Sequence, residues 1–312
     1  MRQPSLYVSL VLTFLPATAL PSFAQQSEMK EIVSKTFPTL KLIQIPAKGR
    51  TFTMGAPKGE PGQLRSETPH EVTLSEDFYL GVTPVTRGQF AAFVKDTGYK
   101  TDPEKGGQGY GWDQAKKSFE GGGKYSWRNP GYAQADEHPV VKTSWNDARA
   151  FCKWLGEKDG QEYGLPTEAQ WEFACRAGSR TRYSFGDDVQ GMAKHANVAD
   201  AKFREVTGMK WGIKENDGYA FTAPVGQYQK NAFGLQDMHG NVMQWCSDVF
   251  GDYPDGAITD PQGPPAKAGS FRVLRGGCWR NAPIYGRSAS RKNGEPDDAG
   301  ETVSFRLAVP VR

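Results

Sequence analysis

The chain has 312 residues, of which 38 are lysine or arginine and 35 are aspartate or glutamate, giving a net charge of +3. A charge this close to balance gives no electrostatic reason to expect a nucleic-acid partner or an anionic membrane surface. The 36 glycines and 21 prolines favour a loop-rich fold over long regular helices and strands.

The N-terminus has the pattern of an export signal. Arg2 precedes an apolar run from Leu6 to Leu20, and Ser22-Phe-Ala24 places small residues at the two positions that a signal peptidase inspects. The run is shorter than the roughly 20 apolar residues that a spanning helix needs, and Pro16 interrupts it. We therefore predict a signal peptide at residues 1–24 and an exported protein, periplasmic or extracellular, with no membrane anchor after cleavage.

The rest of the chain is predicted to form one domain. Residues 25–40 read as a largely polar lead-in, and residues 41–312 show no linker-like change in composition. Short strands are predicted at 41–45, 71–74 and 272–274, separated by long glycine-rich loops. Backbone polar groups in such loops need partners, so we expect bound ions and many side-chain-to-backbone hydrogen bonds.

Three helices are predicted from their capping residues. Thr86 and Gln89 form a capping-box pattern, and Gly98 can end this helix in a left-handed conformation. The same pattern predicts two more helices, one opened by Ser144 and Asp147 with an apolar face up to Gly156, and one opened by Thr167 and Gln170 with Gly178 as its stop.

Several motifs follow one another along the chain in a fixed order. They are Phe52-Thr-Met-Gly55, Phe78 to Phe90, His138-Pro-Val-Val141, Leu165 to Phe173, Asn231 to Trp245, Arg272 to Trp279 and Ser304-Phe-Arg-Leu-Ala308. Together they resemble the formylglycine-generating enzymes, or sulfatase-modifying factors, which oxidise a cysteine in sulfatase active sites to an aldehyde. The resemblance covers residues 41–312 and implies an irregular, loop-rich α+β fold related to C-type lectins, with few short helices.

The resemblance also implies a calcium site in the segment from Asn197 to Tyr219. Its ligands would be the side chains of Asn197 and Asp217 and the backbone carbonyls of Val198 and Tyr219. Calcium binds several oxygen ligands, and a glycine-rich turn can point carbonyls inward beside a carboxylate. The alternative is that Asp217 only caps a turn.

A second calcium site is implied between Asp237 and Gln244. Here the ligands would be the side chains of Asp237 and Gln244 and the carbonyls of Gly240 and Val242. Members of the family usually carry glutamate at the position of Gln244, so this site has one charge fewer and should bind calcium more weakly. Turn capping by Asp237 is again the alternative.

The cysteines bear on the chemistry. In the family, two cysteines shortly after a Gly-Gly-Ser motif bind copper and activate oxygen, because soft thiolates select Cu(I). The matching stretch from Arg280 to Arg287 contains none, so a role for copper stays open. Cys246 and Cys278 are the candidate catalytic pair, and a structural disulfide between them, in an oxidising compartment, is the alternative.

The other two cysteines, Cys152 and Cys175, fall on predicted helices. They are expected to be buried small hydrophobic residues, or to form a bridge with each other.

A long aromatic-rich loop between two of the predicted helices offers a place for a partner. Its residues Trp112, Tyr125, Trp127 and Arg128 either line a groove for a peptide or pack at the surface. By resemblance, the partner would be an extended peptide or a sulfatase-like protein.

Two classes of function follow, and the sequence leaves both open. One is an exported oxidoreductase that acts on a sulfatase-type protein or another secreted substrate. The other is a catalytically silent, calcium-stabilised binding or assembly module on the same scaffold.

Overall fold

The computed structural model describes residues 30–106 and 109–311. The predicted signal peptide, its cleavage site and residues 25–29 of the lead-in lie outside this part of the chain. Strand β1 (Glu31–Val33) falls within the predicted lead-in, and it pairs antiparallel with β2 (Lys41–Ile45), Ile32 opposite Leu42. Regular structure therefore begins before residue 41.

The described residues form three sheets and a hairpin. The first sheet has the order β1-β2-β5-β13, with β5 at Phe78–Gly81 and β13 at Ala308–Pro310. The second has the order β11-β10-β8-β12, with strands at Arg291–Gly294, Arg272–Arg275, Met243–Val249 and Val303–Phe305. The third, β3-β4-β9, uses Arg50–Met54, His70–Leu74 and Ile258–Thr259, and the hairpin joins β6 (Tyr110–Asp113) to β7 (Ser118–Gly121).

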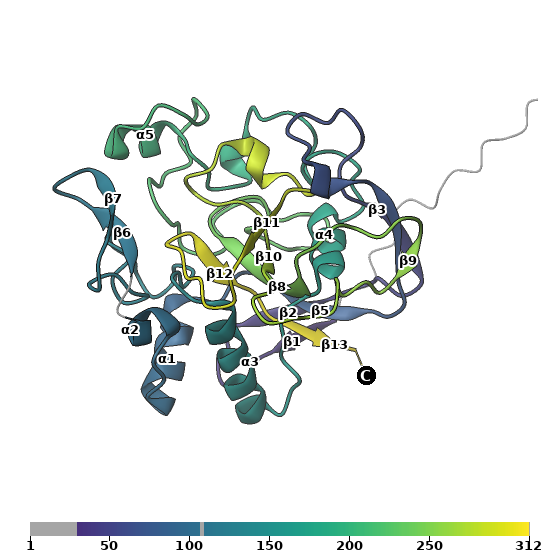
Figure 1. Ribbon diagram of the computed structural model, residues 1–312, viewed down its shortest axis with the longest axis horizontal. Coiled ribbons are helices and arrows are strands. Elements are labelled where there is room, and N and C mark those ends of the chain that lie inside the picture. The colour runs from purple at the N-terminus through teal and green to yellow at the C-terminus, as the bar shows by residue number, and fades with distance from the viewer. Residues whose placement is uncertain (1–29, 107–108, 312) are drawn as a thin grey trace, which may run out of the picture.

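Short helices connect and cover these sheets. They are α1 (Arg87–Thr97), α2 (Asp102–Gly106), α3 (Trp145–Asp159), α4 (Glu168–Arg176) and α5 (Ala201–Thr207), with 3₁₀ turns η1 (Arg65–Glu67), η2 (Met192–Lys194) and η3 (Pro283–Gly286). Helices α1 and α3 lie next to each other, and the β6–β7 hairpin and α5 lie at the opposite end of the molecule from β3 and β9 (Figure 1). The predicted α+β architecture, loop-rich with few short helices, is confirmed.

All three predicted helix starts are confirmed. The hydroxyl of Thr86 accepts a hydrogen bond from the Gln89 amide, and Gly98 ends α1 with φ 67°. The second helix runs through Gly156 and ends at Gly160, which has φ 70°. The missing side chain of Gly156 lets the carbonyl of Gln161 pack closely against the helix. The third ends at Ala177, one residue before the predicted Gly178, with φ 45°.

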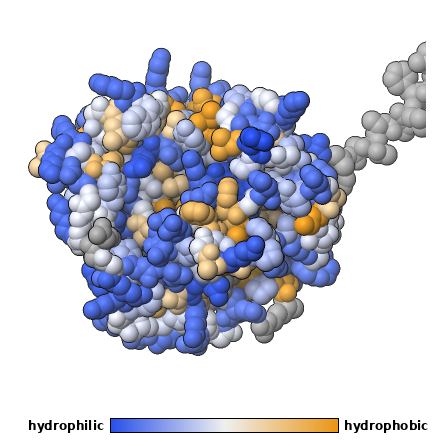
Figure 2. Space-filling model, viewed as in Figure 1, coloured by the Kyte–Doolittle hydropathy of each residue, from blue (hydrophilic) through white to orange (hydrophobic). Residues whose placement is uncertain are grey.

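The core has two main clusters of buried apolar side chains. One lies around α1, α3 and β12, and includes Phe90, Phe151 and Phe305. The other lies around α4 and the strands β3, β4 and β8, and includes Trp171 and Cys246. Hydrophilic residues cover most of the surface in view, with hydrophobic residues gathered in small patches (Figure 2). Within residues 30–106 and 109–311, no helix is long and apolar enough to cross a membrane.

The aromatic residues expected at a groove or at the surface are buried instead. Trp112, Tyr125 and Trp127 are at most 3% exposed. Trp112 packs edge-on against Phe119, with ring centroids 5.1 Å apart. Only Arg128 of this set is exposed, so neither the groove nor the surface-packing prediction holds for the aromatic rings.

Candidate functional site

The C-terminal segment after β10 turns sharply at two glycines. Gly276 and Gly277 have φ values of 99° and 68°, which side-chain-bearing residues rarely adopt. A Cβ atom on Gly277 would lie 2.9 Å from the Cα of Gly286 and from the carbonyl oxygen of Tyr285. The glycines therefore allow the turn to pack directly against η3.

Buried arginines hold this segment in place. Arg275 donates hydrogen bonds to the carbonyls of Ser288, Ala289 and Ser290 at 2.7–2.9 Å and pairs with Glu172. Arg287 pairs with Glu67 at 2.9 Å and with Glu60 at 2.6 Å. Arginine in such positions supplies donors that loop carbonyls and carboxylates would otherwise lack.

The first predicted calcium site has a donor set that suits a cation. Asp217 is held in place by the amides of Val198 and Tyr219, which donate to its two oxygens at 2.9 Å and 3.0 Å. Asn197 is fully buried, and its Oδ1 atom has no hydrogen-bond partner. Burial, with a contribution from the charge of Asp200, raises the pKa of Asp217 to about 7. The buried side-chain oxygen of Asn197 accepts no hydrogen bond and precedes Val198 in the chain. Such an oxygen fits a hard cation such as calcium.

This first set depends on amide and carbonyl oxygens. Among the described residues, no three histidine, cysteine, aspartate or glutamate side chains are grouped so as to hold a metal ion. Calcium accepts such a mixed oxygen set, whereas zinc and copper prefer nitrogen and sulfur ligands.

The second predicted set lies close together but does not suit a cation. The Oε1 atom of Gln244 accepts hydrogen bonds from Trp171 Nε1 at 2.8 Å and from Arg306 Nε at 2.6 Å. The carbonyl of Gly240 accepts the amide of Val242 at 2.8 Å. The side-chain oxygen of Gln244 therefore already accepts two hydrogen bonds, and the guanidinium of Arg306 already supplies a positive charge. Asp237 accepts the amide of Gly226, which matches the turn-capping alternative.

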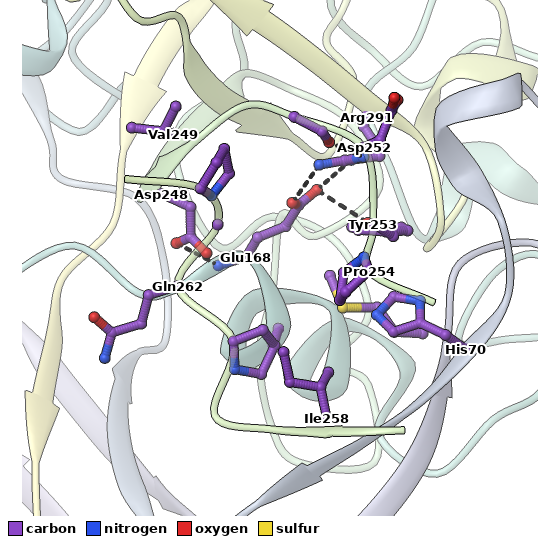
Figure 3. Close-up of a pocket in the computed structure, with 16 residues that line it drawn as sticks. His70, Glu168, Asp248, Val249, Asp252, Tyr253, Pro254, Ile258, Gln262 and Arg291 are labelled. Atoms are coloured by element: carbon purple, nitrogen blue, oxygen red, sulfur yellow. Dashed lines mark hydrogen bonds and ion pairs between the residues drawn. The ribbon is translucent and has the colours of Figure 1, made fainter. Parts of the chain in front are cut away.

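A pocket of about 270 Å³ lies at the start of α4, between β4, the end of β8 and the 249–264 loop (Figure 3). Glu168 is the first residue of α4 and forms a double hydrogen bond with Arg291 of β11, at 2.7 Å for each contact. The hydroxyl of Tyr253 donates to the same carboxylate at 3.2 Å. These three side chains form the polar floor of the pocket.

Asp248, at the end of β8, also lines this pocket. Its Oδ2 atom accepts the Glu168 amide at 2.9 Å and the Ser247 hydroxyl at 3.0 Å. The carboxyl is 4% exposed, and burial, followed by repulsion from Glu168, raises its pKa to about 7.

His70, the first residue of β4, lies on the other side of the pocket (Figure 3). Its Nδ1 atom is 3.2 Å from the carbonyl of Thr68, so Nδ1 carries the proton in a neutral ring. The Nε2 atom is buried and has no hydrogen-bond partner.

The match to known proteins covers nearly the whole described chain. A family model of the sulfatase-modifying factor enzyme 1-like domain matches residues 31–311. The chain belongs to this family.

Two relatives and one solved structure illustrate the range of the sulfatase-modifying factor family. The formylglycine-generating enzyme of Streptomyces coelicolor is 35% identical over 85% of this chain and 88% of its own. The inactive C-alpha-formylglycine-generating enzyme 2 of Bos taurus is 29% identical over 86% of this chain and 88% of its own. The structure of PvdO from Pseudomonas aeruginosa superposes with a TM-score of 0.69 at 33% identity, covering 87% of this chain and 94% of that one.

The four cysteines do not fit the copper pair of the sulfatase-modifying factor family. All four are free and buried. The disulfide considered between Cys246 and Cys278 is not formed in this structure. The bridge considered between Cys152 and Cys175 is not formed either, and the two residues belong to different core clusters. Their expected role as buried small hydrophobic residues is confirmed.

Burial also keeps the candidate thiols protonated. It raises the pKa of Cys278 to about 11 and that of Cys246 far above its usual range. Copper binds the thiolate form, so either thiol would have to lose its proton on binding copper.

Sequence reasoning missed the pocket of His70, Glu168 and Asp248. These residues come from three elements that are far apart in the chain, and no spacing links them. The one available signal was a glutamate directly after the helix cap Thr167, in a motif of the sulfatase-modifying factor family. A glutamate at that position is usual at an exposed helix start and did not indicate burial.

Proposed function

We propose that this protein is an exported, calcium-stabilised binding member of the sulfatase-modifying factor family. It binds an extended peptide of a sulfatase-type or other secreted protein and does not convert the peptide cysteine to the aldehyde. The observation that carries this proposal is the state of the thiols. The stretch from Arg280 to Arg287 has no cysteine, and Cys246 and Cys278 are buried, protonated and differently surrounded.

One comparison supports the absence of this oxidation. A relative that aligns over most of both chains carries the name of an inactive formylglycine-generating enzyme. The scaffold around the missing thiolates is retained, since Arg275 and Arg287 still fix the segment after the glycine turn. A retained scaffold without the reactive pair is consistent with recognition.

The test separates binding from conversion. Reduced protein is incubated with copper, oxygen and a Cys-x-Pro-x-Arg peptide, and the aldehyde is sought by mass spectrometry. Binding of a fluorescent copy of the peptide is followed by anisotropy. We expect saturable binding and no aldehyde, and a scrambled peptide is the control. Absence of binding would refute the recognition role.

Aldehyde formation would refute the proposal in another way. Turnover that disappears in Cys278→Ser would mean that the reactive thiol had moved to Cys278. Turnover that survives this change would place the active centre elsewhere in the fold.

An oxidoreductase is the second candidate function. It is favoured by the 35% identity to a formylglycine-generating enzyme over most of both chains. Such an enzyme would act on a secreted substrate without the thiolate pair. Metal analysis of purified, tag-free protein distinguishes the two candidates, because stoichiometric copper or iron would favour the oxidoreductase and calcium alone the binding protein.

A further inference from the structure

The charged side chains on the floor of the pocket at the start of α4 already neutralise each other. Arg291 makes two hydrogen bonds to Glu168 and two more, to the carbonyls of Ser66 and Gly251 at 2.7 Å and 3.0 Å. Tyr253 also donates to Glu168. The one arginine that lines the pocket is therefore committed to protein groups.

Two acceptors remain available to a ligand. Both side-chain hydrogen bonds of Asp248 fall on Oδ2, and a carboxylate has about four lone-pair sites, so the group keeps acceptor capacity. His70 is 8% exposed, and its Nε2 atom is buried without a partner. An unpaired buried acceptor is unfavourable, so a ligand donor that reaches it gains binding free energy.

The walls of the pocket are mostly apolar. They are formed by Met54, Val249, Ile258, Pro254, Pro261 and Pro264. A dry cavity of about 150 Å³ is large enough to bind benzene, so about 270 Å³ holds a single ring with a short arm. The pocket thus combines an apolar space with acceptors and a carboxylate that has no cationic side chain bound to it.

We propose that this pocket is a binding site for a small organic amine. The apolar body of the ligand lies between Ile258 and the prolines, and its ammonium group donates hydrogen bonds to Asp248, on the side of the pocket opposite His70. An anionic ligand is disfavoured, because it would meet Asp248 while Arg291 is held by Glu168. This site does not depend on the peptide-binding role proposed above.

The experiment compares three ligands of matched shape. Benzylamine, benzyl alcohol and benzoate are titrated into the purified protein by isothermal titration calorimetry at pH 8, where Asp248 is ionised. We expect benzylamine to bind at least tenfold more tightly than benzyl alcohol, and benzoate not to bind. Equal binding of benzylamine and benzoate would overturn the proposal.

Variants then place the ligand in the pocket. Asp248→Asn keeps the acceptor for the Glu168 amide but removes the charge, and we expect at least a tenfold loss of benzylamine affinity. Asp255→Asn is the matched control, since Asp255 is exposed and does not line the pocket, and it should leave the affinity unchanged. Ile258→Trp should abolish binding by filling the apolar space. Unchanged affinity in Asp248→Asn would refute the site.

A direct readout on the unaltered protein covers the case in which a variant does not fold. Crystals soaked with benzylamine should show the ligand between Ile258 and Asp248, and density only at another place would overturn the assignment. A blocked tripeptide with a central lysine carries the same ammonium on a protein chain. If it binds more tightly than benzylamine, the site belongs to a protein side chain and not to a free amine.

Discussion

Single buried charges in this protein are held by specific partners. Glu168 and Arg291 are 5% and 2% exposed in their side chains and form a double hydrogen bond. Removal of one partner of a buried pair leaves the other charge uncompensated, which costs about 3–5 kcal/mol.

We therefore expect Glu168→Gln to lower the free energy of unfolding by about 3–5 kcal/mol in urea denaturation followed by tryptophan fluorescence. Glu157→Gln is the control, because Glu157 is exposed on α3 and should change stability by less than about 0.5 kcal/mol. Similar small effects for both variants would show that the Glu168–Arg291 pair contributes little.

Asp248 should make stability depend on pH in an unusual direction. Its folded-state pKa is raised to about 7, above the value of about 3.9 for an unfolded chain. The folded state then binds the proton more tightly, so its contribution is fully present below pH 4 and is lost as the pH rises through 7. We expect Asp248→Asn to be more stable than the wild type at pH 8, by up to about 1.4 kcal/mol for each pH unit between the two pKa values, with the difference shrinking toward pH 4. Thermal unfolding at both pH values checks this, and an equal difference at pH 4 and pH 8 would contradict it.

Among the elements, the helices were the most predictable part of the fold. Thr86, Ser144 and Thr167 each cap a helix through a local hydrogen bond, and local chemistry is visible in sequence. The apolar pattern of α3 stops at Gly156, but the helix continues to Gly160. Gly156 instead allows a close contact with the carbonyl of Gln161, which only the folded chain reveals. Tertiary contacts also decide whether a predicted calcium segment suits an ion. In the second segment, Arg306 donates a hydrogen bond to the side-chain oxygen of Gln244.

The segment from Asn197 to Tyr219, which contains α5, should respond to calcium. An ion that binds only the folded state stabilises it by about 2.7 kcal/mol at a hundred times its Kd. We expect calcium to raise the Tm and a chelator to lower it. Asp217→Ala should remove most of the gain, whereas Glu205→Gln, an exposed change on α5 within the same segment, should keep it. A Tm that does not change with calcium would rule out the site.

At the scale of the whole molecule, export is the clearest untested expectation. The small residues Ser22 and Ala24 follow a short apolar run, so the mature chain should begin at Gln25. Intact-mass measurement on protein from the native host checks this. Retention of earlier residues on most molecules would contradict the assigned cleavage.

The scaffold as a whole could be predicted because its motifs are spread in order from Phe52 to Ala308. The pocket at α4 could not, since its polar residues meet only when β4, α4, β8 and β11 are assembled. The sequence also gave no measure of how deeply the four thiols lie. Burial raises the pKa of these thiols, and the spacing of the cysteines in the sequence does not reveal it.

The sheet β1-β2-β5-β13 joins the two ends of the described chain. Strand β13 supplies the last pairing, with Ala308 opposite Leu80, more than two hundred residues along the chain. Contacts between segments so distant in sequence slow folding. During synthesis, one edge of β5 therefore stays unpaired until β13 has left the ribosome.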